Sequence, residues 1–160
     1  MREGVDYKRE GAIRTLLKDY TFPEPVPGDL PAVADFDNRA YLANGVLHLK
    51  TGATWNGASG PTKDRWFNGR QNAVRGPLAH DLLYVLARKF LGPLSRQNRS
   101  SYKYWQRIAD DYFDMILEFD GMPNWRRRLW VFAVRRAGFR HITATKWYSV
   151  HKWLPAFFGL

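Results

Sequence analysis

The chain has 160 residues with a formal net charge of +10, and it contains no cysteine. Its 7 tryptophans, 8 tyrosines and 10 phenylalanines are enough to bury one core, which excludes an intrinsically disordered chain. The lack of cysteine excludes a disulfide framework and a cysteine-ligated zinc site. The positive charge favours anionic partners such as phospholipid headgroups, nucleic acid or acidic protein surfaces. We therefore predict a single domain, 1–160, that is held together by packing.

The N-terminus has no apolar run behind a basic cluster, which is the pattern of a secretion signal. No segment approaches the roughly 18 consecutive apolar residues that a membrane span requires. We therefore expect neither a secretion signal nor a transmembrane segment.

The first 60 residues are expected to form a small antiparallel β element with loops. Partial alternation over 12–21 favours a strand, although a leucine pair within it also fits a helix. Four prolines within 22–31 exclude a helix interior or a central strand. The segments 41–43 and 46–50 flank Asn44-Gly45, the strongest short signal for a hairpin turn. The glycine-rich segment that follows is predicted to be a loop.

Three helices are predicted from apolar side chains at 3.6-residue spacing. The first covers 77–90 and opens with a Gly-Pro pair, which suits a first helical turn. The second covers 99–119, and the short connection between them favours antiparallel packing. The third covers 124–137 and is expected to end at Gly138.

These elements together predict a mainly α fold with a small N-terminal antiparallel β element. The β hairpin and loops would occupy 1–60 and a helical core would occupy 77–138. Within the core, two antiparallel helices carry a His-Asp-x-x-Tyr motif and an Asp-x-x-Phe motif. A basic, aromatic and helical segment would form the C-terminal tail, 139–160.

The first predicted helix places His80 and Asp81 side by side among leucines. Such a pair is unusual in an apolar helix unless other groups satisfy it. A histidine titrates near neutrality and can take a proton from water when a second group orients its ring. Asp81 projects about 100° away around the helix axis, so the orienting acid must come from elsewhere. Tyr84 lies four residues on, on the same face as His80.

The second predicted helix offers two candidates for the orienting acid, Asp110 and Asp111. Both flank the apolar stripe of that helix, and either can face an antiparallel neighbour. Periodicity alone does not choose between them.

The segment His80-Asp81-Leu82-Leu83-Tyr84, followed by Asp110-Asp111-Tyr112-Phe113, resembles the paired-helix pattern of secreted and prokaryotic phospholipases A2. It is also similar to the phospholipase domain of some small-virus capsid proteins. The resemblance implies that His80 activates a water molecule and that Asp110, three residues before Phe113, orients His80. It also implies that Tyr84 hydrogen-bonds Asp110.

The same resemblance implies a Ca²⁺ cofactor held by Asp81, with Asn56, Gly57 and Ser59 as further ligands from the loop 56–60. The cation and backbone N–H groups near Gly57 would stabilise the oxyanion. We therefore expect a lipid ester hydrolase of phospholipase A2 type.

Over roughly 34–138 the chain also resembles a family of small phage and prophage proteins of unassigned function. The shared elements are Asn56-Gly57-Ala58-Ser59, the His-Asp-x-x-Tyr motif, Ala109-Asp110, and Ala133-Val134-Arg135 with Gly138. This resemblance implies a phage-derived protein located in the host cytoplasm or in the virion.

A second interpretation fits the same motif. The polar residues would tie two helices together inside a virion component associated with the tail, neck or capsid, without catalysis. No short histidine spacing supports a zinc site.

The stretch 125–152 contains eight lysines and arginines and no acid. It is either a solvated helix face or a contact surface for anionic lipid or for other virion proteins. Nucleic acid ranks below both, because no nucleic-acid-binding motif is present. The predicted contact residues are Arg126, Arg127, Arg128, Trp147 and Trp153.

Overall fold

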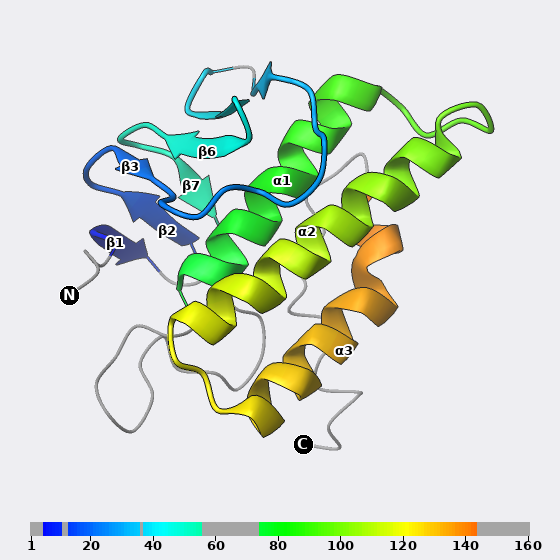
Figure 1. Cartoon of the computed structure of the whole chain (residues 1–160). Coiled ribbons are helices and arrows are strands. Elements are labelled where there is room, and N and C mark those ends of the chain that lie inside the picture. Colours follow the sequence, from blue (N-terminus) through cyan, green and yellow to red (C-terminus); the bar gives the residue numbers. More distant parts are fainter. Residues whose placement is uncertain (1–4, 11–12, 36, 56–73, 144–160) are drawn as a thin grey trace.

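The computed structural model describes residues 5–10, 13–35, 37–55 and 74–143 (Figure 1). Within these residues the chain forms three helices and seven short strands in two sheets. The fold is therefore mixed α/β, and the prediction of a mainly α fold is wrong. The small N-terminal β element was expected, but it is more extensive than one hairpin. Three of its strands have only two residues each. Tyr20–Thr21 falls within 12–21, where alternation favoured a strand, whereas Thr54–Trp55 falls in the segment that was predicted to be a loop, so that part of the loop prediction is wrong.

Both sheets are antiparallel throughout. The first has the order β1-β2-β7 and the second has the order β3-β6-β5-β4. The strands are β1 (Tyr7–Glu10), β2 (Ile13–Leu16), β3 (Tyr20–Thr21), β4 (Val33–Ala34), β5 (Ala40–Ala43), β6 (Val46–Leu49) and β7 (Thr54–Trp55).

The predicted hairpin is confirmed as β5 and β6. Ala40 pairs with Leu49 and Ala43 pairs with Val46 across the turn. Asn44 and Gly45 have φ angles of 52° and 72°, the positive values that a type I′ turn requires at both central positions. Alternate side chains of both strands, including Leu42 and Leu47, are buried in the main core.

The three helices are α1 (Arg75–Leu91), α2 (Arg99–Phe119) and α3 (Asn124–Ile142). The bounds of α1 and α2 confirm the predicted helices to within two residues. α3 does not end at Gly138 but continues for four more residues, so that boundary was wrong. None of these three helices, taken over the described residues, is long and apolar enough to cross a membrane.

α1 lies at the centre of the molecule, between the strands and α2 (Figure 1). α2 and α3 run side by side in opposite directions, so the C-terminal end of α3 lies near the N-terminal half of α2. This position explains why α1 is buried around most of its circumference, including His80 and Tyr84. A smaller apolar cluster fills the α2–α3 contact, where Phe113 and Leu117 meet Val131.

A buried ionic cluster joins the N-terminal part of the chain to the helices. Arg75, at the start of α1, donates to Glu24 and, at 2.6 Å from Nη1 to Oδ1, to Asp120 at the end of α2. Tyr112 donates to the backbone carbonyl of Glu24 at 2.7 Å. Because the Pro-rich segment carrying Glu24 has no regular structure, these contacts fix it against α1 and α2.

Candidate active site

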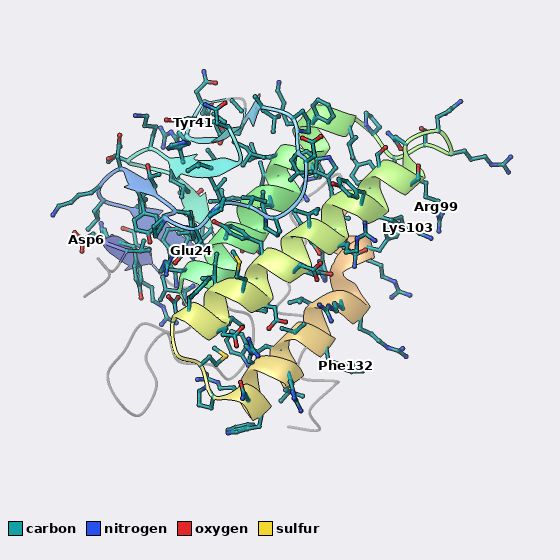
Figure 2. All side chains as sticks on the ribbon, viewed as in Figure 1. Asp6, Glu24, Tyr41, Arg99, Lys103 and Phe132 are labelled. Atoms are coloured by element: carbon teal, nitrogen blue, oxygen red, sulfur yellow. The ribbon has the colours of Figure 1, made fainter. Side chains whose placement is uncertain are left out.

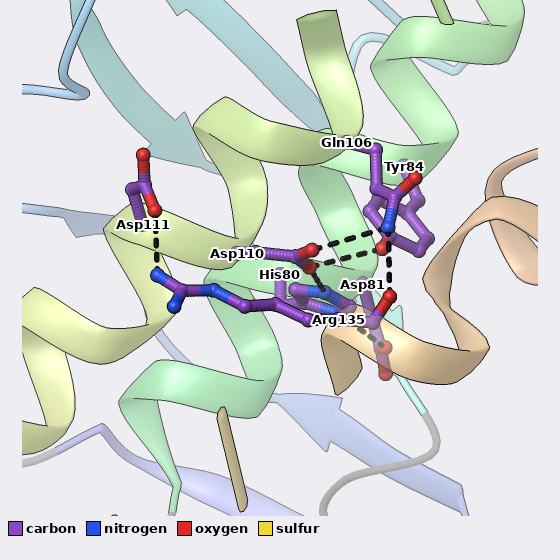
Figure 3. A network of polar contacts seen from close by, with 7 residues as sticks. All are labelled: His80, Asp81, Tyr84, Gln106, Asp110, Asp111 and Arg135. Atoms are coloured by element: carbon purple, nitrogen blue, oxygen red, sulfur yellow. Dashed lines mark hydrogen bonds and ion pairs between the residues drawn. The ribbon is translucent and has the colours of Figure 1, made fainter. Parts of the chain in front are cut away.

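His80 and Asp110 form a buried dyad across the α1–α2 contact (Figure 3). His80 Nε2 lies 2.8 Å from Asp110 Oδ1, which is a hydrogen-bond distance. His80 is 7% exposed and Asp110 is 2% exposed. The two residues meet because α1 and α2 pack antiparallel with these positions on their facing sides. The dyad is therefore a product of helix packing between residues 30 positions apart.

Two further donors hold the Asp110 carboxylate. Tyr84 donates its hydroxyl proton to Oδ1 at 3.1 Å, one helical turn beyond His80 on α1. Gln106 Nε2 donates to Oδ2 at 3.2 Å from one turn earlier on α2. The same Gln106 amide also approaches the backbone carbonyl oxygen of Arg135 on α3, at 3.3 Å. All three helices thus contribute to the network around Asp110 (Figure 3).

Asp111 is not part of this network. It points away from His80 and forms an ion pair with Arg135, whose Nη2 donates to Asp111 Oδ1 at 2.9 Å (Figure 3). About half of the Asp111 side chain is exposed. The choice between Asp110 and Asp111, which periodicity left open, is therefore decided by the rotation of α2 in the packed structure. That rotation buries Asp110 next to Tyr112 and Phe113 and leaves Asp111 on the surface.

Asp81 lies beside the other nitrogen of the His80 ring. Its Oδ1 atom is 3.9 Å from His80 Nδ1, which is too long for a hydrogen bond, and its side chain is 30% exposed. Within the described residues, Nδ1 therefore has no hydrogen-bond partner. The ring is held at Nε2, and a carboxylate lies next to Nδ1.

The charges around the dyad shift the acid–base equilibria of its members. Burial alone lowers the pKa of His80, but the hydrogen bond to Asp110 and the charges of Asp110 and Asp81 outweigh burial, so this pKa lies above 6.5. Burial, reinforced by the negative charge of Asp110, holds the pKa of Tyr84 well above 10. Tyr84 therefore stays protonated and remains a donor to Asp110 at all physiological pH values.

The described residues supply one of the predicted calcium ligands, Asp81. No group of three or more histidine, aspartate or glutamate side chains suitable for a metal occurs within the part of the chain that the structure describes. Calcium takes six to eight oxygen ligands, so a site at Asp81 would need further oxygen ligands besides this carboxylate. The other predicted ligands, Asn56, Gly57 and Ser59, lie outside the described residues.

The three predicted contact arginines at the start of α3 have different environments. Arg126 is buried, with its guanidinium 5.1 Å from the centre of the Trp130 ring. Arg127 is paired with Asp114 and Glu118 of α2, at 3.4 Å and 2.5 Å. Arg128 is exposed. Trp147 and Trp153 lie outside the described residues.

Sequence reasoning missed three residues that shape the site. Gln106 lies four residues before Asp110, and that spacing was the only sign in the sequence that its side chain reaches the Asp110 carboxylate. Gly138 was taken as a helix end, whereas it brings α3 against Tyr84 and Gln106. His141 was assigned to the basic tail, but its half-buried ring lies near the end of α3, where the charges of Asp81 and His80 affect its pKa. Burial lowers the pKa of His141 and outweighs the opposite effect of Asp81.

Comparisons with protein-family models, with curated proteins and with solved structures find no match for this chain. The geometry around His80 is therefore the main indication of what this protein does.

Proposed function

We propose that this protein is an ester hydrolase of phospholipase A2 type, in which His80 activates a water molecule. The observation that carries the proposal is the arrangement of the His80 ring. Nε2 is fixed by Asp110 at 2.8 Å, while Nδ1 has no hydrogen-bond partner among the described residues and has a carboxylate beside it. General-base catalysis on water requires one held nitrogen and one nitrogen that can accept a proton.

In the proposed reaction, His80 Nδ1 takes a proton from water while the water oxygen attacks the ester carbonyl. Asp110 stabilises the imidazolium that forms, and Tyr84 and Gln106 keep the Asp110 carboxylate in place. When the tetrahedral intermediate collapses, the C–O bond of the ester breaks and His80 returns the proton to the leaving alkoxide. The products are a carboxylic acid and an alcohol, which for a phospholipid are a fatty acid and a lysophospholipid.

Ca²⁺ remains a proposed cofactor with Asp81 as its one described ligand. When bound, such an ion would supply positive charge to the developing oxyanion. The proposed proton transfers do not pass through the ion.

The proposed substrate surface is anionic phospholipid, and α3 offers a contact face for it. Trp125, Leu129 and Phe132 are 64%, 42% and 58% exposed, and their i, i+4, i+7 spacing places them on one side of α3. Arg128 and Arg136 lie exposed along the same helix. Exposed aromatic side chains combined with arginines suit the boundary between headgroups and acyl chains.

The test is release of fatty acid from vesicles of phosphatidylglycerol, with added Ca²⁺ and with a calcium chelator. We expect His80→Ala and Asp110→Asn to lower the rate by about 10²-fold to 10⁴-fold, the usual contribution of general-base catalysis. Asp111→Asn is the matched control, because it makes the same chemical change at the neighbouring acid outside the network. Equal rates for wild type and His80→Ala would contradict the proposal.

The burial of the network favours a second candidate function. His80 and Asp110 are almost completely covered, and satisfied buried polar networks specify how helices pack. In this alternative the protein is a virion component that keeps the motif as a structural network. Purified particles would then contain the protein at fixed stoichiometry and wild type would release no fatty acid. His80→Ala would lower the free energy of unfolding by about 1–3 kcal/mol because Asp110 loses a buried partner.

A further inference from the structure

An open groove of about 330 Å³ lies between α2 and α3, next to the buried network, and His80 is not among the residues that line it. Lys103, Gln106, Arg107 and Asp110 line it from α2, and Arg135 and Phe139 line it from α3. Gln106, which lines the groove, donates to Oδ2 of Asp110, whereas His80 lies against the opposite oxygen, Oδ1. The volume is at the small end of the range for ligand sites, about 300–1,000 Å³.

Among the described residues, an acid balances only one of the three cations that line this groove, because Arg135 is paired with Asp111. Arg99, Lys103 and Arg107 follow one another at i, i+4 spacing, an arrangement in which like charges destabilise a helix. Lys103 and Arg107 form no ion pair with the described residues, and Figure 2 shows Arg99 and Lys103 on the side of α2 that lies beside the C-terminal part of α3. The groove has one acid in its lining, Asp110, and that carboxylate already accepts three hydrogen bonds.

Aromatic rings orient two of these cations. The Arg107 guanidinium lies 5.5 Å from the centre of the Tyr104 ring, and the Arg99 guanidinium lies 5.1 Å from the centre of the Phe139 ring. Stacking of this kind restricts a guanidinium while leaving its N–H groups free for an oxyanion. Arg135 faces them from α3, held in place by its ion pair with Asp111.

We propose that the α2–α3 groove is a binding site for a phosphate group, with Lys103, Arg107 and Arg135 as its ligands. A phosphate offers several oxygens to donors from opposite walls, and arginine binds such groups with paired hydrogen bonds. The site is distinct from the proposed reaction centre, because it adjoins the Gln106 side of Asp110. Gln106 contacts both the groove and Asp110, so an anion in the groove also changes the electrostatic environment of the His80–Asp110 pair.

The test is a titration with inorganic phosphate at low ionic strength, followed by the NMR signals of the Gln106 side-chain amide and the His80 ring. Wild type should show saturable shifts at both positions. Lys103→Gln/Arg107→Gln should lower the affinity at least about tenfold, equivalent to about 1.4 kcal/mol. Lys89→Gln/Arg96→Gln is the matched control, since it removes one lysine and one arginine charge from exposed positions outside the groove and should bind as wild type does.

A second measurement distinguishes a soluble phosphate from a lipid headgroup. Binding to phosphatidylcholine vesicles is measured with and without phosphatidic acid. Loss of the phosphatidic acid dependence in the groove variant identifies a headgroup, whereas loss of phosphate binding with unchanged vesicle binding identifies a soluble phosphate. Equal phosphate affinity of wild type, groove variant and control would overturn the proposal, as would a titration without saturation. Neither measurement depends on hydrolase activity.

Discussion

Gly138 of α3 packs against the phenol oxygen of Tyr84 on α1. A Cβ atom at position 138 would collide with that oxygen and would stand 2.8 Å from Gln106 Nε2. Both atoms belong to the network around Asp110. α3 therefore closes over the network at a point where only a glycine fits, which explains a glycine inside the helix, where this residue is otherwise unfavourable.

The Gly138→Ala substitution should destabilise the protein. Alanine in a helix interior normally adds up to about 1 kcal/mol relative to glycine. Here the added methyl group must displace Tyr84 or Gln106, and overpacking of this kind costs about 1–3 kcal/mol. Urea unfolding measures the difference. A more stable Gly138→Ala variant would show that the contact has no energetic importance.

A double-mutant cycle identifies Tyr84 as the origin of this effect. Tyr84→Phe removes the oxygen that collides with the new methyl group, so Gly138→Ala should be less destabilising in the Tyr84→Phe background than in wild type. Ala137→Gly is the control for helix propensity, because residue 137 is exposed on the same turn.

The stability contributed by His80 should decrease as pH rises. The pKa of His80 in the folded protein lies above 6.5, so the protonated ring is favoured in the folded state. This contribution is fully present below the unfolded-state pKa near 6.5 and is lost as pH rises through the folded-state pKa. The difference in unfolding free energy between wild type and His80→Gln should therefore shrink from about pH 5 to about pH 9. A constant difference would contradict the raised pKa.

If the protein is a hydrolase, its rate should follow the same ionisation. The neutral His80 ring is the base, so activity should increase with pH through a pKa above 6.5. In Asp110→Asn, burial is no longer opposed by the Asp110 charge, and the remaining activity should rise at lower pH than in wild type. An unchanged pH–rate profile in this variant would show that Asp110 does not affect the pKa of the group whose ionisation controls the rate.

Removing Arg75 should be far more damaging than removing an exposed arginine. Arg75→Met removes the cation that pairs with the side chains of Glu24 and Asp120, and breaking a buried pair in this way costs about 3–5 kcal/mol. Arg135→Gln is the comparison, because its pair with Asp111 is about half exposed and is worth at most about 1 kcal/mol. Equal effects in urea unfolding would mean that burial of the Arg75 cluster is unimportant.

The β5–β6 turn offers a test of backbone strain without steric contact. Gly45 has a φ of 72°, and a Cβ there would meet no atom within 4 Å. Gly45→Ala should still cost about 1–2 kcal/mol, because a residue with a Cβ is strained in the left-handed region. Gly45→Asn should cost less, since asparagine tolerates this conformation. Equal stability of the alanine and asparagine variants would contradict this explanation.

Much of the helical part was predictable because its signals are local. The apolar spacing of α1 and α2 and the Asn44-Gly45 turn depend on neighbouring residues alone. The strand at Thr54–Trp55 was not predictable, because its pairing partner is distant: Thr54 pairs with Thr15. The end of α3 was misjudged because Gly138 was interpreted by its helix-ending tendency, whereas a contact with another helix determines its role.

For the site, helical periodicity alone places His80, Asp81 and Tyr84 on one helix and His80 and Tyr84 on one face of it, because this periodicity follows from backbone geometry. The packing of the helices determines that Asp110 rather than Asp111 meets His80 and that Gln106 donates to the second carboxylate oxygen. It also determines how α3 covers the network. These outcomes depend on the rotation of α2 and α3 about their axes, which is set by the apolar surfaces that all the elements bury together.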